Sequence, residues 1–157
     1  MVKINVDAAW KATSSHSGIG ACVRNYLGAS IAGRCSLGSF NSALEAEAEV
    51  VVNGVNLAAS LSLKKVIVEG DCRDVMLAMS EEVQSANWKI QPMVRKVQSL
   101  LHLFDQIEWN WVPRDANHLA DAAAKMAMSE LCSLDWDSCP PTSLSGILRA
   151  DGLPGPP

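Results

Sequence analysis

The chain has 157 residues, of which 48% are hydrophobic and 19% charged, and its formal net charge is −4. This size and composition indicate one ordinary globular domain, and the acidic balance argues against a strongly basic nucleic-acid-binding protein. The five cysteines form no CxxC pair and no apolar run could span a bilayer, so we expect reduced thiols, an intracellular (nuclear or cytoplasmic) location and no membrane association. We also expect a monomer.

The first half of the chain predicts three strands and a long helix. Residues 2–8 alternate apolar and polar side chains, which is typical of a strand with one buried face. Residues 19–24 and 29–37 predict two further strands, and the turn sequence at 25–28 joins them into a hairpin. Residues 43–61 carry apolar side chains near the 3.6-residue period of a helix.

The second half predicts two strands and three helices. Residues 64–69 form a short β-branched strand, and residues 72–79 predict a short helix after it. A longer helix is expected over residues 88–104, with a proline in its first turn where the missing N–H costs little. Residues 106–112 alternate as a fifth strand, and residues 117–131 predict a last, alanine-rich helix.

This order, β-β-β-α-β-α-α-β-α, predicts an α/β fold. We expect a mixed five-stranded sheet, in which three antiparallel strands come first and two parallel strands follow, with helices on both faces. The domain should occupy residues 1–132. Proline-rich segments after that point predict that residues 133–157 form a loosely packed or disordered tail.

Four acidic residues lie where predicted elements begin or end. Asp7 closes the first strand, Glu47 opens the long helix, Asp71 follows the fourth strand and Asp121 lies in the first turn of the last helix. Sites in α/β proteins are usually built at the ends of parallel strands. If these carboxylates converged, they would repel one another unless cations held them, so they suggest a divalent-metal site and chemistry on phosphates.

Helical periodicity separates Glu47 from its two acidic neighbours. The residues on the Glu47 face of the helix are mostly apolar: Val50, Val51, Gly54, Val55 and Ala58. The face that carries Glu45 and Glu49 is mostly polar, and Glu45 also completes a capping box with Ser42. Glu47 is therefore the charge that points toward the core side, where an unpaired carboxylate is rare.

Each of the other acids also has an ordinary structural explanation. Asp71 could be a helix N-cap, because it stands between a strand and a helix. Asp121 could only complement the helix dipole, and Asp7 could be the solvated end of an alternating strand. Taken singly, none of these residues requires a function.

Five segments, in this order along the chain, resemble the type 1 ribonuclease H superfamily, and more closely its plant, retroelement-related "reverse transcriptase-like" branch. They are Asn5–Trp10, Gly18–Arg24, Ala46–Ala48, Val66–Asp71 and Val112–Asp121. The resemblance covers about residues 3–130. It implies an RNase H-like fold and places the family's four metal-binding acids on Asp7, Glu47, Asp71 and Asp121.

The activity that this resemblance implies is hydrolysis of the RNA strand of an RNA–DNA hybrid with two Mg²⁺ ions, or with Mn²⁺ in their place. Two divalent ions roughly 3.5–4 Å apart can stabilise both the attacking water and the leaving oxygen of an in-line displacement. By analogy with the family, Asp7 would bridge both ions, Asp121 would complete the water-activating one, and Glu47 and Asp71 would hold the other.

Five further residues are candidates for contact with the nucleic acid. Arg24 and Ser42 match positions at which relatives contact the DNA-strand phosphate, and Asn117 matches a family asparagine that could also only cap the helix. Arg73 could face the backbone or water. Trp10 follows Asp7 closely and is the best candidate for stacking on a base.

Departures from the family pattern keep other functions open. The family's usual Asp-Gly is Asp7-Ala8 here. The interval between Asp71 and Asp121 is too short for the basic helix with which bacterial relatives bind substrate. His118 is a weak counterpart of their loop histidine. The alternatives are a catalytically weak or inactive RNase H-like module that binds nucleic acid or a protein partner, or a nuclease with another substrate, such as DNA or Holliday junctions.

Overall fold

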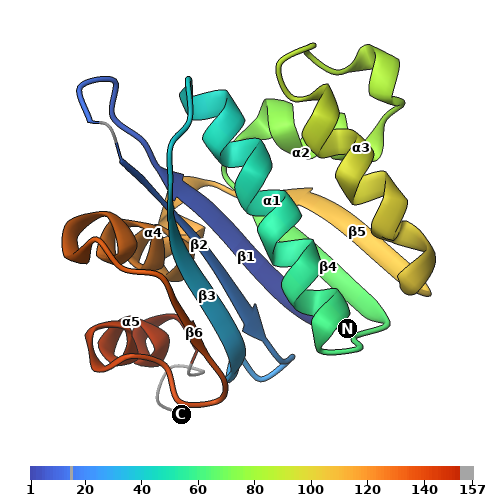
Figure 1. Ribbon diagram of the computed structural model, residues 1–157. Helices are drawn as coiled ribbons and strands as arrows, with labels where there is room; N and C mark the ends of the chain where they lie inside the picture. Colours follow the sequence, from blue (N-terminus) through green and yellow to red (C-terminus); the bar gives the residue numbers. More distant parts are fainter. Residues whose placement is uncertain (15, 153–157) are drawn as a thin grey trace.

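The computed structural model describes residues 1–14 and 16–152. One six-stranded mixed sheet has the strand order β5-β4-β1-β2-β3-β6 (Figure 1). The strands are β1 (Val2–Ala9), β2 (Ser17–Arg24), β3 (Ser30–Gly38), β4 (Lys65–Gly70), β5 (Gln106–Trp111) and β6 (Leu134–Trp136). The helices are α1 (Ala43–Ser60), α2 (Arg73–Ser80), α3 (Gln91–Leu100), α4 (His118–Glu130) and α5 (Thr142–Gly152), with 3-10 turns at Val83–Ser85, Leu101–Leu103 and Arg114–Ala116.

The topology confirms the predicted α/β class and corrects the strand count. Strands β1, β2 and β3 pair antiparallel, whereas β4 pairs parallel to both β1 and β5. The prediction of five strands is wrong, because β6 pairs antiparallel with β3 at the edge of the sheet. The sequence pattern missed β6 because three residues are too few to show an alternation.

Helices cover both faces of the sheet (Figure 1). Helix α1 packs on the face that carries Ile4 and Val6: a Cβ added at Gly54 of α1 would lie 2.8 Å from a Val6 methyl. Helix α4 packs on the other face, and a Cβ at Gly20 of β2 would lie 2.7 Å from the Ala120 carbonyl oxygen. Glycines thus let both helices approach the middle of the sheet closely.

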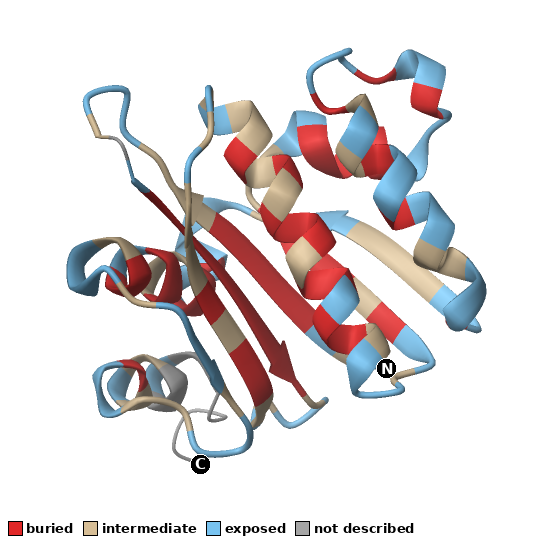
Figure 2. Cartoon of the chain, viewed as in Figure 1, coloured by how far each residue is buried: buried red, intermediate tan, exposed pale blue. Residues whose placement is uncertain are grey.

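The largest hydrophobic cluster lies between the sheet and helices α1, α2 and α3 (Figure 2). Val50, Val51 and Val55 of α1 are at most 1% exposed, which confirms the apolar face that the helical period predicted. A smaller cluster around Leu119 and Leu144 joins α4 to α5. No helix within the described residues is long and apolar enough to cross a membrane.

The predicted elements differ from the observed ones mainly after residue 87. The helix expected over 88–104 is observed as α3 with Pro92 in its first turn, followed by a 3-10 turn. The segment expected to be a loose tail contains β6 and α5 in its described part, and Leu144 is 1% exposed. Residues 153–157 of that tail lie outside the described residues. The domain boundary at residue 132 stays a prediction.

Candidate metal centre

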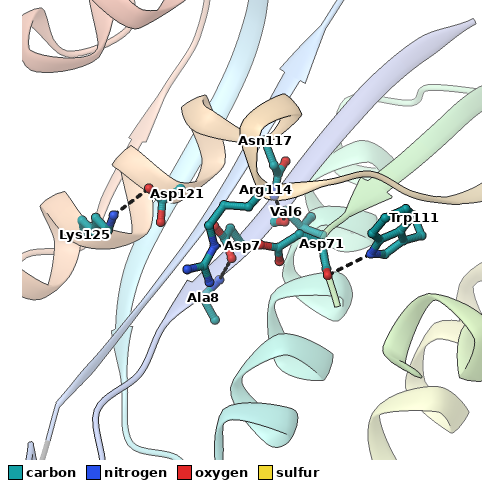
Figure 3. Close-up of polar contacts among 9 residues, drawn as sticks. All are labelled: Val6, Asp7, Ala8, Asp71, Trp111, Arg114, Asn117, Asp121 and Lys125. Carbon is teal, nitrogen blue, oxygen red and sulfur yellow. Dashed lines mark hydrogen bonds and ion pairs between the residues drawn. The ribbon is translucent and has the colours of Figure 1, made fainter. Parts of the chain in front are cut away.

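Asp7 of β1 and Asp71, which directly follows β4, meet at the point where these two parallel strands stop pairing. The last pair in the β1–β4 register is Val6 with Gly70. Asp7 is the next residue of β1, which continues to Ala9, and Asp71 is the first residue after β4, so their carboxylates lie close together where the pairing stops. Asp7 is 1% exposed, and its Oδ1 accepts a hydrogen bond from the Ala8 N–H at 2.9 Å (Figure 3).

Helix α1 adds a third carboxylate. Oxygen atoms of Asp7, Glu47 and Asp71 all lie within 4.8 Å of one another, and we call these three residues the acid cluster. The predicted choice of Glu47 over Glu45 agrees with this placement. The Glu45 carboxylate instead accepts a hydrogen bond from the backbone N–H of Asn41, at 3.1 Å.

Asp121 is not one of the three carboxylates that lie within 4.8 Å of one another, and its assignment to the metal site stays a prediction. It lies in the first turn of α4, and its Oδ2 accepts a hydrogen bond from Lys125 Nζ at 2.8 Å (Figure 3). This (i, i+4) ion pair holds the carboxylate along the helix. Asp121 is still near enough to contribute to the raised pKa of Asp7.

Burial and mutual repulsion disfavour the charged forms of two cluster members. Burial raises the pKa of Asp7 to about 7, and the charges of Asp71 and Asp121 add to the effect. Burial also raises the pKa of Glu47 to about 9, with repulsion from Asp7 and Asp71 as the next causes. Ionising all three carboxylates at once is therefore energetically unfavourable unless a cation lies among them.

Two residues that the sequence did not single out complete the surroundings of Asp71. Arg114 Nε lies 3.3 Å from Asp71 Oδ2, and the Arg114 side chain is 74% exposed (Figure 3). Trp111 Nε1 donates to the Asp71 carbonyl oxygen at 3.1 Å. Trp111 is 51% exposed although it lies at the end of β5. The only signal for Arg114 was its position just after a strand end.

The residues present fit a divalent cation. Asp7 Oδ2 is buried and has no hydrogen-bond partner, although unpartnered buried oxygens are uncommon in proteins. Carboxylate oxygens are the ligands that Mg²⁺ and Mn²⁺ prefer. A cation among Asp7, Glu47 and Asp71 would both satisfy this oxygen and remove the repulsion.

An open pocket of about 470 Å³ lies between the end of β1 and helix α4. Its lining includes Trp10 and Lys11 from the β1 side, and Arg114, Asp121 and Lys125 from the α4 side. Trp10 was predicted to stack on a base, and it lines this pocket while its Nε1 donates to the Phe40 carbonyl oxygen at 3.0 Å.

The other predicted nucleic-acid contacts differ in exposure. Arg24 and Asn117 are buried and hydrogen-bonded inside the protein. Ser42 is the N-cap of α1, and its Oγ accepts from the Glu45 N–H at 3.2 Å. Arg73 and His118 are exposed at the starts of α2 and α4.

Comparison with known protein families identifies one match. Residues 5–127 match the family described as reverse transcriptase-like. A search of curated proteins finds no match.

Similar solved structures are ribonuclease H domains. The N-terminal RNase H domain of a Mycobacterium tuberculosis protein is 25% identical, with a TM-score of 0.75 over 82% of this chain and 94% of that one. RNase H1 from the halophilic archaeon Halobacterium salinarum is 20% identical, with a TM-score of 0.74 over 82% of this chain and 98% of that one. LC11-RNase H1, from compost and bound to an RNA/DNA hybrid, is 14% identical, with a TM-score of 0.73 over 83% and 99%. The last two likenesses concern the fold.

Proposed function

Because this chain belongs to the reverse transcriptase-like family, we propose that it is a metal-dependent endonuclease of ribonuclease H type, which hydrolyses the RNA strand of RNA–DNA hybrids. The observation that carries the proposal is the acid cluster at the ends of β1 and β4, with a buried Asp7 oxygen that has no partner. The likeness to ribonuclease H domains, one of them bound to an RNA/DNA hybrid, supports this substrate class.

Asp7, Glu47 and Asp71 would hold the metal ions. Two Mg²⁺, or Mn²⁺ in their place, would supply Lewis-acid stabilisation of the attacking water and the leaving oxygen. Asp7 is the most buried of the three acids, and its strand β1 both pairs with β4 and packs against α1, so it is our candidate for the ligand shared by both ions. Asp121 is close enough for its charge to raise the pKa of Asp7, and it would complete the set once Lys125 releases it.

The cations at the rim of the acid cluster would bind the substrate. Arg114 and Lys125 line the open pocket beside Asp121, and Lys11 adds a third positive charge there. A guanidinium and ammonium groups are suited to phosphate oxygens. We therefore assign this pocket to the RNA strand next to the cleaved phosphodiester. The flat side chain of Trp10 on its wall suits a stacked base.

The test is cleavage of an end-labelled RNA–DNA hybrid in Mg²⁺ and in Mn²⁺. We expect wild-type protein to cut the RNA strand and Asp7→Asn to lose roughly 100-fold or more of that activity, since it removes a charged ligand. Asp74→Asn is the matched control, because Asp74 is an exposed aspartate in the first turn of α2. Absence of hybrid cleavage by wild-type protein in either metal would contradict the enzymatic proposal.

A second candidate function is hybrid binding without turnover. It is favoured by the two ion pairs that Arg114 and Lys125 make with site acids, because these cations compete with metal. The alanine that replaces the family's glycine after Asp7 supports this second function less than the sequence suggested. In the described residues the only non-glycine residues with positive φ are Ser62 and Leu131, so Ala8 occupies its place in β1 without needing glycine's freedom.

Hybrid affinity that is equal in wild type and Asp7→Asn, with no cleavage by either, would favour the binding module. A panel with duplex DNA and a four-way junction in the same assay addresses the remaining alternative. Cleavage of either one in preference to the hybrid would move the assignment to another nuclease activity.

A further inference from the structure

A chain of buried polar side chains lies beside the acid cluster, on the same strands. Asn5 is at its centre: its Oδ1 accepts from Arg24 Nη2 at 2.8 Å and from Arg24 Nε at 3.2 Å. The Asn5 Nδ2 donates to Glu69 Oε2 at 3.0 Å and to Asn117 Oδ1 at 3.3 Å. Arg24, Asn5, Glu69 and Asn117 are each no more than 9% exposed, and we call them the polar network.

The charges in the polar network are balanced. Arg24 is positive and Glu69 is negative, and Asn5 bonds to both of them. Lys3 reaches the second oxygen of Glu69 from the surface, at 2.9 Å. Every buried side-chain atom of the four network residues has a partner, since the unpartnered buried atoms in the described residues belong to Asp7 and Asn53. A fully paired network of this kind holds its elements in one arrangement.

Three network residues lie close in the sequence to three acids of the proposed site, which are Asp7, Asp71 and Asp121. Asn5 is two residues before Asp7 and Glu69 is two residues before Asp71, and residues at i and i+2 of a strand lie on the same face. The network therefore lies one side-chain pair behind the acids along β1 and β4.

The third connection is made by Asn117, the N-cap of α4. Asn117 Nδ2 donates to the carbonyl oxygen of Val6, which directly precedes Asp7, at 2.9 Å. The Asn117 carbonyl oxygen accepts from the N–H of Asp121 at 3.1 Å. Asn117 thus ties the helix that carries Asp121 to the strand that carries Asp7.

We propose that the polar network is a positioning frame, which fixes the strand end of Asp7, the strand end of Asp71 and the helix start of Asp121 at the spacing that metal binding requires. This inference rests on the proposed metal-dependent function. It assigns Arg24 and Asn117 to positioning, in place of the direct nucleic-acid contact that the family pattern suggested. None of the four residues is a catalytic residue, because none touches the reacting atoms.

Arg24→Met separates the two roles, because it keeps most of the aliphatic stem and removes both bonds to Asn5. A positioning frame predicts that Mn²⁺ affinity, measured by titration calorimetry with the metal alone, weakens about tenfold. It also predicts that kcat for the hybrid falls while KM changes less than about twofold. Direct contact with the nucleic acid predicts the reverse: KM rises, and Mn²⁺ affinity and kcat stay at the wild-type values.

Two further variants keep the test informative if Arg24→Met folds poorly. Arg24→Lys retains the charge and a donor, so it should recover part of the Mn²⁺ affinity. Leu144→Ala is a control for stability alone, because Leu144 is buried between α4 and α5 and is not in the network. It should lower Tm and leave Mn²⁺ affinity unchanged. If Leu144→Ala weakens Mn²⁺ binding as much as Arg24→Met at equal loss of Tm, the frame is overturned.

The outcome for wild-type protein separates this inference from the proposed function. Mn²⁺ binding without hybrid cleavage contradicts the nuclease and leaves the calorimetry of Arg24→Met to decide the frame. Hybrid cleavage with equal Mn²⁺ affinity in wild type and Arg24→Met overturns the frame alone. Wild-type protein that binds no Mn²⁺ overturns both.

Discussion

Two groups of buried polar side chains lie next to each other along β1 and β4, and they differ in how completely they are paired. The polar network around Asn5 has a partner for each of its buried side-chain atoms. The acid cluster has three carboxylates within 4.8 Å and a buried Asp7 oxygen without a partner. The same two strands thus carry a satisfied set and, one side-chain pair further on, an unsatisfied one.

This difference indicates which group acts on a ligand. A paired network stabilises the fold as it stands, whereas an unpaired cluster lowers stability unless something binds. Substitutions should therefore have opposite effects in the two places. Substitutions in the acid cluster should remove function and relieve the repulsion among the carboxylates. Substitutions in the polar network should mainly lower the stability of the fold.

The largest expected effect is on activity, at Glu47. Glu47→Gln should lower metal-dependent hybrid cleavage by roughly 100-fold or more and raise the Tm of the metal-free protein, because it removes a ligand and a carboxyl group whose ionisation the folded state disfavours. Glu49→Gln, on the same helix and outside the acid cluster, is the control. If the two variants have equal activity, the helical assignment is wrong.

The next effect is on stability, at Asn5. Asn5→Leu would leave Arg24 and Glu69 buried without their shared partner, so we expect the free energy of unfolding to fall by roughly 3 kcal/mol. Asn56→Leu, on the exposed side of α1, should change it by less than about 0.5 kcal/mol. Urea denaturation measures both. Similar values for the two variants would show that the polar network adds nothing to the fold.

The pH dependence of stability follows from the raised pKa values of the acid cluster. The folded pKa of Glu47, about 9, is above its ordinary value of 4.5, so the folded state binds more protons between these values than the unfolded state does. Stability is therefore present at low pH and lost as pH rises through that window. Asp7, with a pKa of about 7, adds to the loss in the lower part of the window.

We expect Tm in EDTA to fall by roughly 5 °C between pH 5 and pH 9, and to fall less in Glu47→Gln. Calorimetric scans at several pH values measure this. With Mn²⁺ present the trend should weaken, because metal affinity rises as the ligands lose protons. A wild-type Tm in EDTA that rises with pH over this range would contradict the assigned burial of Glu47.

The smallest expected effect on stability and metal affinity is at Lys125, which pairs with Asp121 on α4 beside the acid cluster. The Lys125 side chain is 67% exposed, so Lys125→Met should change the free energy of unfolding by less than about 0.5 kcal/mol. It should raise Mn²⁺ affinity by about threefold, because it frees Asp121 and removes a positive charge. Weaker Mn²⁺ binding in this variant would mean that Lys125 supports the site, not that it competes with metal.

Much of the fold could be predicted from the sequence because its elements are strongly periodic. The alternation in residues 2–8 and the apolar face of residues 43–61 correspond to β1 and α1, and the helix face also separated Glu47 from Glu45 and Glu49. Strand β6 carries three residues and too little pattern to detect.

The site was predicted less completely because side-chain partners are set by tertiary contacts. The i, i+4 spacing of Asp121 and Lys125 is a local pattern of a helix, but nothing local shows that Arg114 reaches Asp71. Arg24 and Asn117 match family positions, yet both are buried and hydrogen-bonded to Asn5, which is distant from both in the sequence. Sequence patterns and the family resemblance selected the acids as candidates, and the structure was needed to show which buried polar side chains are paired and which are not.

The most direct test of the central claim is the position of bound Mn²⁺ in crystals of the wild-type protein. We predict an anomalous scattering peak with Asp7, Glu47 and Asp71 carboxylate oxygens as ligands, at roughly 2.0–2.2 Å. A second peak nearer Asp121 would support the proposal of two metal ions. If crystals that bind Mn²⁺ elsewhere show no peak at the acid cluster, these three residues do not form the metal site.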